Sequence, residues 1–120
     1  MDELLCPCQV VIPMDYNPDH EDEPPREVEP EVFAGIISLI VTRFGDYSLV
    51  TPPPPGGMAS GSWRGQADRS YRIEVGLPQR RTHEFVEVVY EIGKRLRQKA
   101  MYYVILPPSA RVMPIDNESA

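Results

Sequence analysis

The residues of this chain that could do chemistry gather around one predicted strand, residues 69–78. Glu74 stands in the middle of that run, where an isolated carboxylate is uncommon, and Arg72 lies on the same face. A carboxylate in this position is a candidate general base or hydrogen-bond acceptor for a ligand, and Arg72 is a candidate contact for an anion. The structural alternative is that Glu74 pairs with Arg72 or with an arginine of a neighbouring element.

Two further side chains extend this candidate site. Trp63 is the only tryptophan and precedes the strand, and Gln98 precedes the last predicted strand. We hypothesise that Trp63, Glu74 and Gln98 converge at one end of a sheet and form the wall of a small-ligand site. The alternative for Trp63 is a loop anchor whose ring covers one end of the core.

Metal, redox and cofactor chemistry find little support. Cys6 and Cys8 supply two thiolates, whereas a structural zinc site takes four ligands, and nothing places His20 or His83 beside them. We therefore expect reduced thiols, no bound metal and no cofactor. The sequence contains no P-loop, no dinucleotide-binding glycine motif and no nucleophile elbow, so it favours a non-catalytic protein over an enzyme.

The negative charge is concentrated in one segment. Residues 1–31 carry ten acidic side chains and one basic one, a net charge of −9, whereas residues 32–120 carry a net charge of +3. The overall pI of about 4.8 argues against a general nucleic-acid binder, because such affinity comes mostly from neutralising phosphates. The acids predicted to steer a partner by long-range attraction are Asp19, Glu21, Asp22 and Glu23.

Hydrophobic periodicity divides the chain into six predicted elements. Apolar residues recur at helical spacing after Pro30 and after Thr82, the predicted N-cap of the second helix, and alternate with polar residues in 69–78. The elements are strand 8–16, helix 30–45, strand 47–51, strand 69–78, helix 82–100 and strand 101–106. An acidic, proline-rich loop (17–30), a Pro/Gly loop (52–62) and a tail (109–120) complete the chain.

This order, β-α-β-β-α-β, predicts an α+β fold. With short, right-handed connections it gives a ferredoxin-like plait, a four-stranded antiparallel sheet with both helices on one face, in a single domain 1–120. The rival is a rearranged pairing in which 47–51 does not join the sheet. No apolar run reaches the ~18 residues of a membrane span. The acidic start, MDELL, is unlike a signal peptide, so we expect a cytoplasmic protein with no membrane partner.

The plait leaves one sheet face without helices. Arg72 and Glu74 line that face, together with one alternating set of the last strand, and both possible sets are largely apolar. Exposed apolar patches usually mark interfaces. We therefore expect a homodimer that packs sheet on sheet, or a cover from a terminal tail, with a ligand pocket as the alternative.

Four residues also carry a family resemblance. Gly61, Trp63, Glu74 and Gln98 match a pattern of Gly-x-Trp, a strand glutamate and Gln-x-Ala before the last strand. In this pattern the chain resembles a set of small bacterial and phage proteins of uncharacterised function, over roughly residues 30–106. The resemblance implies a ferredoxin-like fold and a shared site, and no particular reaction. The acidic loop and the PPPPGG loop depart from the pattern.

Together these features predict a non-catalytic, regulatory interaction protein that dimerises and binds a macromolecular partner. By analogy, small acidic proteins of phages and mobile elements inhibit nucleic-acid-binding machinery in this way. The alternative is a small-ligand-binding protein or small enzyme with a pocket at Trp63, Glu74 and Gln98. A third reading, a nucleic-acid binder, requires Arg80, Arg81, Arg95 and Arg97 to form one continuous patch.

Overall fold

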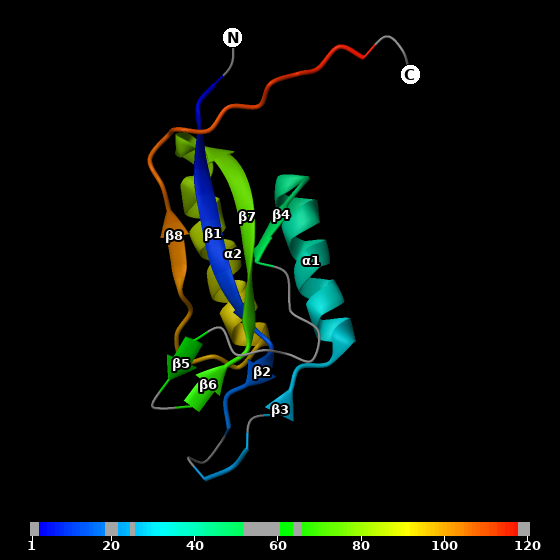
Figure 1. Cartoon of the computed structure of the whole chain (residues 1–120), viewed down its shortest axis with the longest axis vertical. Coiled ribbons are helices and arrows are strands. Elements are labelled where there is room, and N and C mark those ends of the chain that lie inside the picture. Colours follow the sequence, from blue (N-terminus) through cyan, green and yellow to red (C-terminus); the bar gives the residue numbers. More distant parts are fainter. Residues whose placement is uncertain (1–2, 19–21, 25, 52–60, 64–65, 118–120) are drawn as a thin grey trace.

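A four-stranded antiparallel sheet forms the centre of the molecule (Figure 1). The computed structural model describes residues 3–18, 22–24, 26–51, 61–63 and 66–117. The strand order is β4-β7-β1-β8, and every neighbouring pair is antiparallel. The strands are β1 (Leu5–Pro13), β4 (Ser48–Thr51), β7 (Ser70–Pro78) and β8 (Tyr103–Ile105). The predicted α+β class and antiparallel sheet are confirmed, and residues 48–51 do join the sheet.

The two long central strands, β1 and β7, bury alternate side chains against the helices. Val10 lies opposite Ile73 and Cys8 opposite Val75, so the inward residues of both strands meet in register. This alternation is the one expected when a single face of a sheet packs on a core. The buried inward residues of these two strands are Cys6, Cys8, Val10, Ile12, Tyr71, Ile73, Val75 and Leu77.

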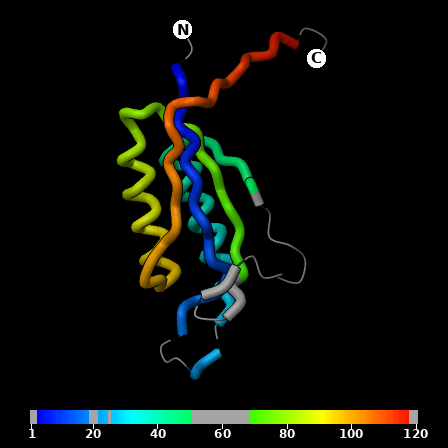
Figure 2. The backbone as a smooth tube through the Cα atoms, turned by 60° about the vertical axis from the view of Figure 1, so that its left-hand side comes forward, coloured from blue at the N-terminus to red at the C-terminus, as the bar shows by residue number. Residues whose placement is uncertain are grey.

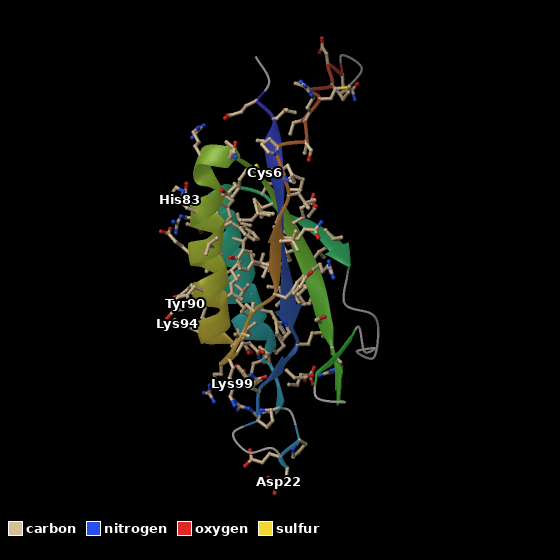
Figure 3. The ribbon with its side chains drawn as sticks, turned by 90° about the vertical axis from the view of Figure 1, so that its left-hand side faces the viewer. Cys6, Asp22, His83, Tyr90, Lys94 and Lys99 are labelled. Carbon is tan, nitrogen blue, oxygen red and sulfur yellow. The ribbon has the colours of Figure 1, made fainter. Side chains whose placement is uncertain are left out.

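Two helices cover that face, α1 (Pro30–Phe44) and α2 (Thr82–Arg95), and Figure 3 shows both on the same side of the sheet. Gly45 ends α1 with a φ of 86°, as predicted for a glycine C-terminal to a helix. A 3₁₀ helix, η1 (Gln79–Arg81), precedes α2, and Thr82 is the first residue of α2 rather than its cap. Thr82 Oγ1 donates instead to the carbonyl oxygen of Gln79 at 3.0 Å.

The second helix is shorter than predicted. It ends at Arg95 because Arg97 adopts a left-handed φ of 54°. The backbone N–H of Gln98 donates to the carbonyl of Gly93, and that of Arg97 to the carbonyl of Lys94, which is the hydrogen-bond pattern of a Schellman motif. The predicted buried stripe (Phe85, Val88, Val89, Ile92, Leu96) is confirmed.

Two short hairpins extend the sheet at one end (Figure 1). The predicted first strand, 8–16, divides at Met14 into β1 and β2 (Asp15–Tyr16), and β2 pairs with β3 (Arg26–Glu27) inside the predicted loop. A second hairpin joins β5 (Gly61–Trp63) to β6 (Gln66–Asp68). Proline at position 13 has no N–H for continued pairing, which is consistent with the break there.

Among the described residues, no helix has the length and apolar composition that crossing a bilayer requires.

Candidate interaction surfaces

Glu74 and Arg72 lie on the helix-free face of the sheet, as predicted. Gln9 on β1 is directly opposite Glu74 on β7, and Gln9 Nε2 donates to Glu74 Oε1 at 2.8 Å. The polar partner of Glu74 is therefore an amide on the neighbouring strand rather than the predicted arginine. Val104 on β8 lies opposite Gln9 on its other side, so polar and apolar side chains alternate across this face.

Gln98 lies elsewhere in the molecule. Its Nε2 donates to the carbonyl oxygens of Asp15 at 3.2 Å and Leu96 at 3.0 Å. Asp15 is six residues beyond Gln9 along the chain, about 20 Å at a strand rise of ~3.3 Å per residue. Glu74 and Gln98 therefore do not converge on one small ligand. Trp63 ends β5, and its side chain lies outside the described residues.

A polar cluster holds the β2–β3 hairpin against the body of the protein. Arg69 makes a bidentate contact with Asp15, with Nε donating to Oδ2 at 3.1 Å and Nη2 to Oδ1 at 2.5 Å. Tyr16 is only 7% exposed, and its hydroxyl donates to Glu29 Oε2 at 2.5 Å. We call the hairpin with these residues the anchored end.

Two guanidinium groups approach the ring of Tyr16. Arg26 lies 4.6 Å and Arg97 5.3 Å from the ring centroid, within the range of cation–π attraction. The hydrogen bond to Glu29 raises the pKa of Tyr16 and lowers that of Glu29. The unusual left-handed backbone of Arg97 thus directs its side chain to this cluster.

The acidic loop projects beyond the anchored end. Of the four predicted steering residues, Asp22 and Glu23 are described and exposed, and Figure 3 shows Asp22 at the extreme tip of the molecule. Asp19 and Glu21 lie outside the described residues, as does His20. Asp15 and Glu29 are engaged within the anchored end, whereas Asp22 at the tip and Glu27 on β3 are exposed.

A shallow groove of about 260 Å³ runs between α2 and the segment that leads into β8. Gly93 and Met101 meet on its floor, where a Cβ at position 93 would lie 2.8 Å from Met101 Cγ. Tyr90 on its rim is 71% exposed, and Lys94 Nζ lies 5.7 Å from the Tyr90 ring. The groove was not predicted, although an internal helical glycine at 93 was a signal of close packing.

The groove carries apolar side chains along its length and positive charge at one end. The residues lining it are Val86, Val89, Tyr90, Gly93, Lys94, Gln98, Lys99, Ala100, Met101 and Tyr103. Figure 3 shows Tyr90 and Lys94 on the outer side of α2, with Lys99 beyond its end. Gln98 is the one predicted site residue that lines it.

The cysteines are buried and free. Cys8 Sγ donates to the carbonyl oxygen of Cys6 at 3.3 Å, and burial raises the pKa of Cys8 to about 11. Such a thiol is inert at neutral pH because the thiolate is the reactive form. In the described part of the chain, no group of three or more His, Cys, Asp or Glu side chains is arranged to hold a metal ion.

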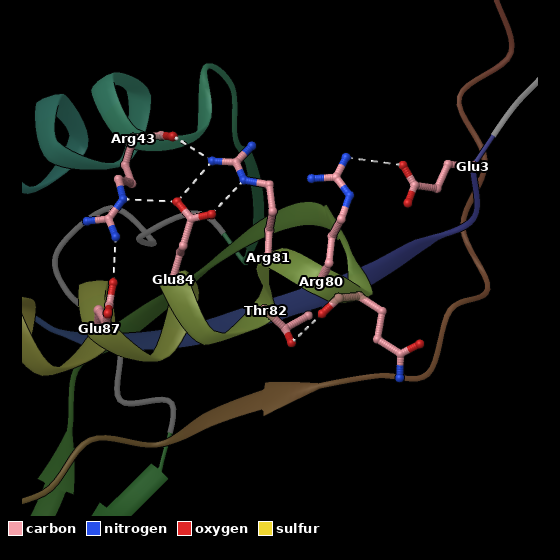
Figure 4. Close-up of polar contacts among 8 residues, drawn as sticks. Glu3, Arg43, Arg80, Arg81, Thr82, Glu84 and Glu87 are labelled. Carbon is pink, nitrogen blue, oxygen red and sulfur yellow. Dashed lines mark hydrogen bonds and ion pairs between the residues drawn. The ribbon is translucent and has the colours of Figure 1, made fainter.

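Three of the four arginines in the predicted basic patch are engaged in ion pairs. Glu84 accepts from both Arg81 and Arg43, and these hydrogen bonds lower its pKa to about 2 (Figure 4). Arg80 pairs with Glu3, and Arg95 with Glu91. The predicted patch of Arg80, Arg81, Arg95 and Arg97 is therefore divided between the two ends of a 14-residue helix.

Comparisons with family models, curated proteins and solved structures found no match to this chain.

Proposed function

We propose that this is a non-catalytic interaction protein that dimerises and binds a macromolecular partner through its acidic end. The observation that carries the proposal is the projecting acidic tip, with exposed Asp22 and Glu23, on a hairpin that polar contacts hold to the body. The partner is a protein with a basic surface.

The geometry of the anchored end favours a binding role. The bidentate Arg69–Asp15 pair and the Tyr16–Glu29 hydrogen bond restrict the base of the loop. A loop with a fixed base loses less conformational freedom on binding than a free chain does. Exposed carboxylates at a protruding tip also attract a basic surface before contact is made, and this attraction weakens as salt rises.

The fold and family assignments are part of the same proposal. The chain passes from β1 through α1 to β4, and from β7 through α2 to β8, with both helices on the same face of the sheet. This connectivity supports the ferredoxin-like plait. The resemblance to small bacterial and phage proteins through Gly61, Trp63, Glu74 and Gln98 supports a phage or mobile-element inhibitor. Buried, free thiols agree with a cytoplasmic location.

The test is affinity capture from an extract of the source cells, quantified by mass spectrometry at about 50 and 300 mM NaCl. The tip variant combines Asp19→Asn, Glu21→Gln, Asp22→Asn and Glu23→Gln. A control variant neutralises four carboxylates elsewhere, with Glu31→Gln, Asp46→Asn, Glu87→Gln and Glu91→Gln. We expect the wild type and the control to retain a basic partner at low salt, and the tip variant to lose it.

Kinetics with the purified partner then test the steering. We expect the association rate to fall about tenfold between the two salt concentrations, with a smaller change in the dissociation rate. An association rate that does not respond to salt, or a partner retained by the tip variant, would contradict the proposal.

A further inference from the structure

Backbone hydrogen bonds tie the C-terminal segment to the sheet between Leu106 and Ala110. The N–H of Leu106 donates to the carbonyl of Pro7, and the N–H groups of Ser109 and Ala110 donate to the carbonyl of Leu5. The N–H of Leu5 donates back to Ala110. These bonds hold residues 106–110 across the start of β1.

Beyond Ala110 the chain forms an extended arm, residues 111–117, that runs away from the body in both Figure 1 and Figure 2. Its large apolar side chains are among the most exposed of the described residues. Val112 is 68% exposed, Met113 79% and Ile115 76%. Three such residues within four positions of an extended segment are typical of a contact with another surface.

The arm is long enough to lie along the groove. Seven extended residues span about 23 Å at a strand rise of ~3.3 Å. The groove follows α2 from Val86 to Lys94, about 12 Å at the helical rise of 1.5 Å per residue, and continues past the end of the helix to Lys99. An arm laid along α2 is therefore long enough to cover the helical part of the groove and to extend toward Lys99.

The two surfaces are also complementary in chemistry. The arm presents Val112, Met113 and Ile115 and then the exposed carboxylate of Asp116. In the same order, the groove presents apolar Val86 and Val89 and then the cations Lys94 and Lys99. The groove also borders β8, one of the two edge strands of the sheet, which can accept an added extended segment.

An arm cannot reach the groove of its own chain in the observed conformation. Leu5 and Ala110 lie at the opposite end of β1 from Asp15, whereas Gln98, beside Lys99, contacts Asp15. The arm would have to reverse direction after Ala110 and run back past β8. A second copy of the chain can supply the same arm without disturbing the bonds at Leu5.

We propose that the C-terminal arm of one copy lies in the α2–β8 groove of a second copy, and that the exchange is reciprocal. Such an exchange is a two-fold symmetric interface, in which each copy contributes the same arm and the same groove. This inference rests on the dimer of the proposed function and names its contact. It replaces the sheet-on-sheet packing expected from the sequence.

The test is sedimentation equilibrium of the full chain and single-site variants. Met113→Asp alters the arm, Tyr90→Asp alters the groove, and Leu49→Asp places the same charge on an exposed apolar residue of the β4 edge. We expect the first two variants to weaken dimerisation by about 100-fold and Leu49→Asp to change it less than threefold. Circular dichroism checks that each variant is folded, and Tyr90→Ala replaces Tyr90→Asp if that variant is not.

A charge exchange tests the direction of the arm. Asp116→Lys and Lys94→Glu should each weaken the dimer about fivefold, and the double variant should recover most of the loss. If the double variant dimerises no more tightly than the two separate losses of affinity predict when combined, the proposed direction of the arm is overturned.

The outcomes separate this inference from the proposed function. A wild type that stays monomeric at high concentration overturns both the dimer and the arm exchange. A dimer unaffected by Met113→Asp and Tyr90→Asp overturns the arm exchange alone. A dimer that dissociates with Met113→Asp but not with the Tyr90 variants shows that the arm binds elsewhere, which overturns the groove as its site.

Discussion

The sheet is extended at both ends, and the two extensions are held in different ways. At the anchored end, Asp15 pairs with Arg69 and Tyr16 with Glu29, so polar groups leaving the sheet find partners in the same chain. At the other end, the arm leaves Ala110 with Val112, Met113 and Ile115 largely exposed.

The difference shows which kinds of side chain can find partners within a single chain. Charged and hydroxyl groups need only one or two well-placed partners, which a short hairpin can provide. Exposed apolar side chains need a surface that excludes water, and a seven-residue arm cannot make one for itself. The anchored end should therefore contribute to the stability of the monomer, and the arm to association.

The largest effect on monomer stability should come from Arg69→Ala. This change leaves Asp15, 20% exposed, without its bidentate partner, and we expect a loss of about 2 kcal/mol in the free energy of unfolding. Deletion of residues 111–120 should change it by less than about 0.5 kcal/mol, because the arm is exposed. Urea unfolding below the dimer dissociation constant measures both. Equal losses would break the distinction between the two ends.

A smaller effect is expected from Tyr16→Phe, which removes only the hydroxyl that donates to Glu29. We expect a loss of about 1 kcal/mol, because the phenylalanine ring retains the packing and the cation–π contacts. The matched control is Tyr102→Phe, at a position that is 62% exposed and outside the groove, and thermal unfolding should show no change for it. If both substitutions are neutral, the Tyr16 hydroxyl does not hold the hairpin.

Arg97 tests whether the anchored end accepts backbone strain. Its φ of 54° suits glycine, whereas its guanidinium lies 5.3 Å from the Tyr16 ring. We expect Arg97→Gly to be more stable than Arg97→Ala by about 1 kcal/mol, because only alanine retains the left-handed penalty. Relative to wild type, Arg97→Gly should be close to neutral, since relief of strain offsets the lost cation–π contact. Chemical denaturation of the three proteins gives both differences, and equal stability of the two variants would exclude strain.

The smallest expected effect concerns the polar network of Glu84 with Arg81 and Arg43, and it is present at neutral pH and lost in acid. Hydrogen bonds from Arg81 and Arg43 lower the pKa of Glu84 to about 2. A lowered pKa contributes stability above the unfolded value of 4.5, and this contribution is lost as pH falls toward 2. Glu84→Gln should flatten the dependence of the unfolding free energy on pH between pH 2 and 4.5, whereas deletion of the arm should leave that dependence unchanged. An unchanged profile for Glu84→Gln would show that the network does not stabilise the fold.

The sequence was sufficient for the elements of the sheet and helices. Alternation in 69–78 and helical spacing after Pro30 and Thr82 reflect burial on one face, which is written directly into the order of residues. Element ends were less accurate, because the early end of α2 depends on Arg97 adopting a left-handed φ that its residue type disfavours. The break of the first strand at Met14 follows Pro13, so that end was readable from residue type.

The candidate sites depended more on tertiary structure. The projecting acidic segment and the helix-free position of Glu74 follow from local sequence and from the alternation of a strand. Three other features do not follow from local sequence: the separation of Glu74 from Gln98, the pairing of Asp15 with Arg69, and the groove between α2 and β8. Each of these relates residues that are tens of positions apart, and their distances are set by the packing of whole elements.

The sequence by itself thus determined which faces are buried and where charge collects, because both depend on residue type and periodicity. Only the tertiary structure decided which polar groups meet and which apolar groups remain exposed. Those relations depend on the relative placement of β1, β7, β8 and α2, and on where the backbone hydrogen bonds of Ser109 and Ala110 join the chain to β1.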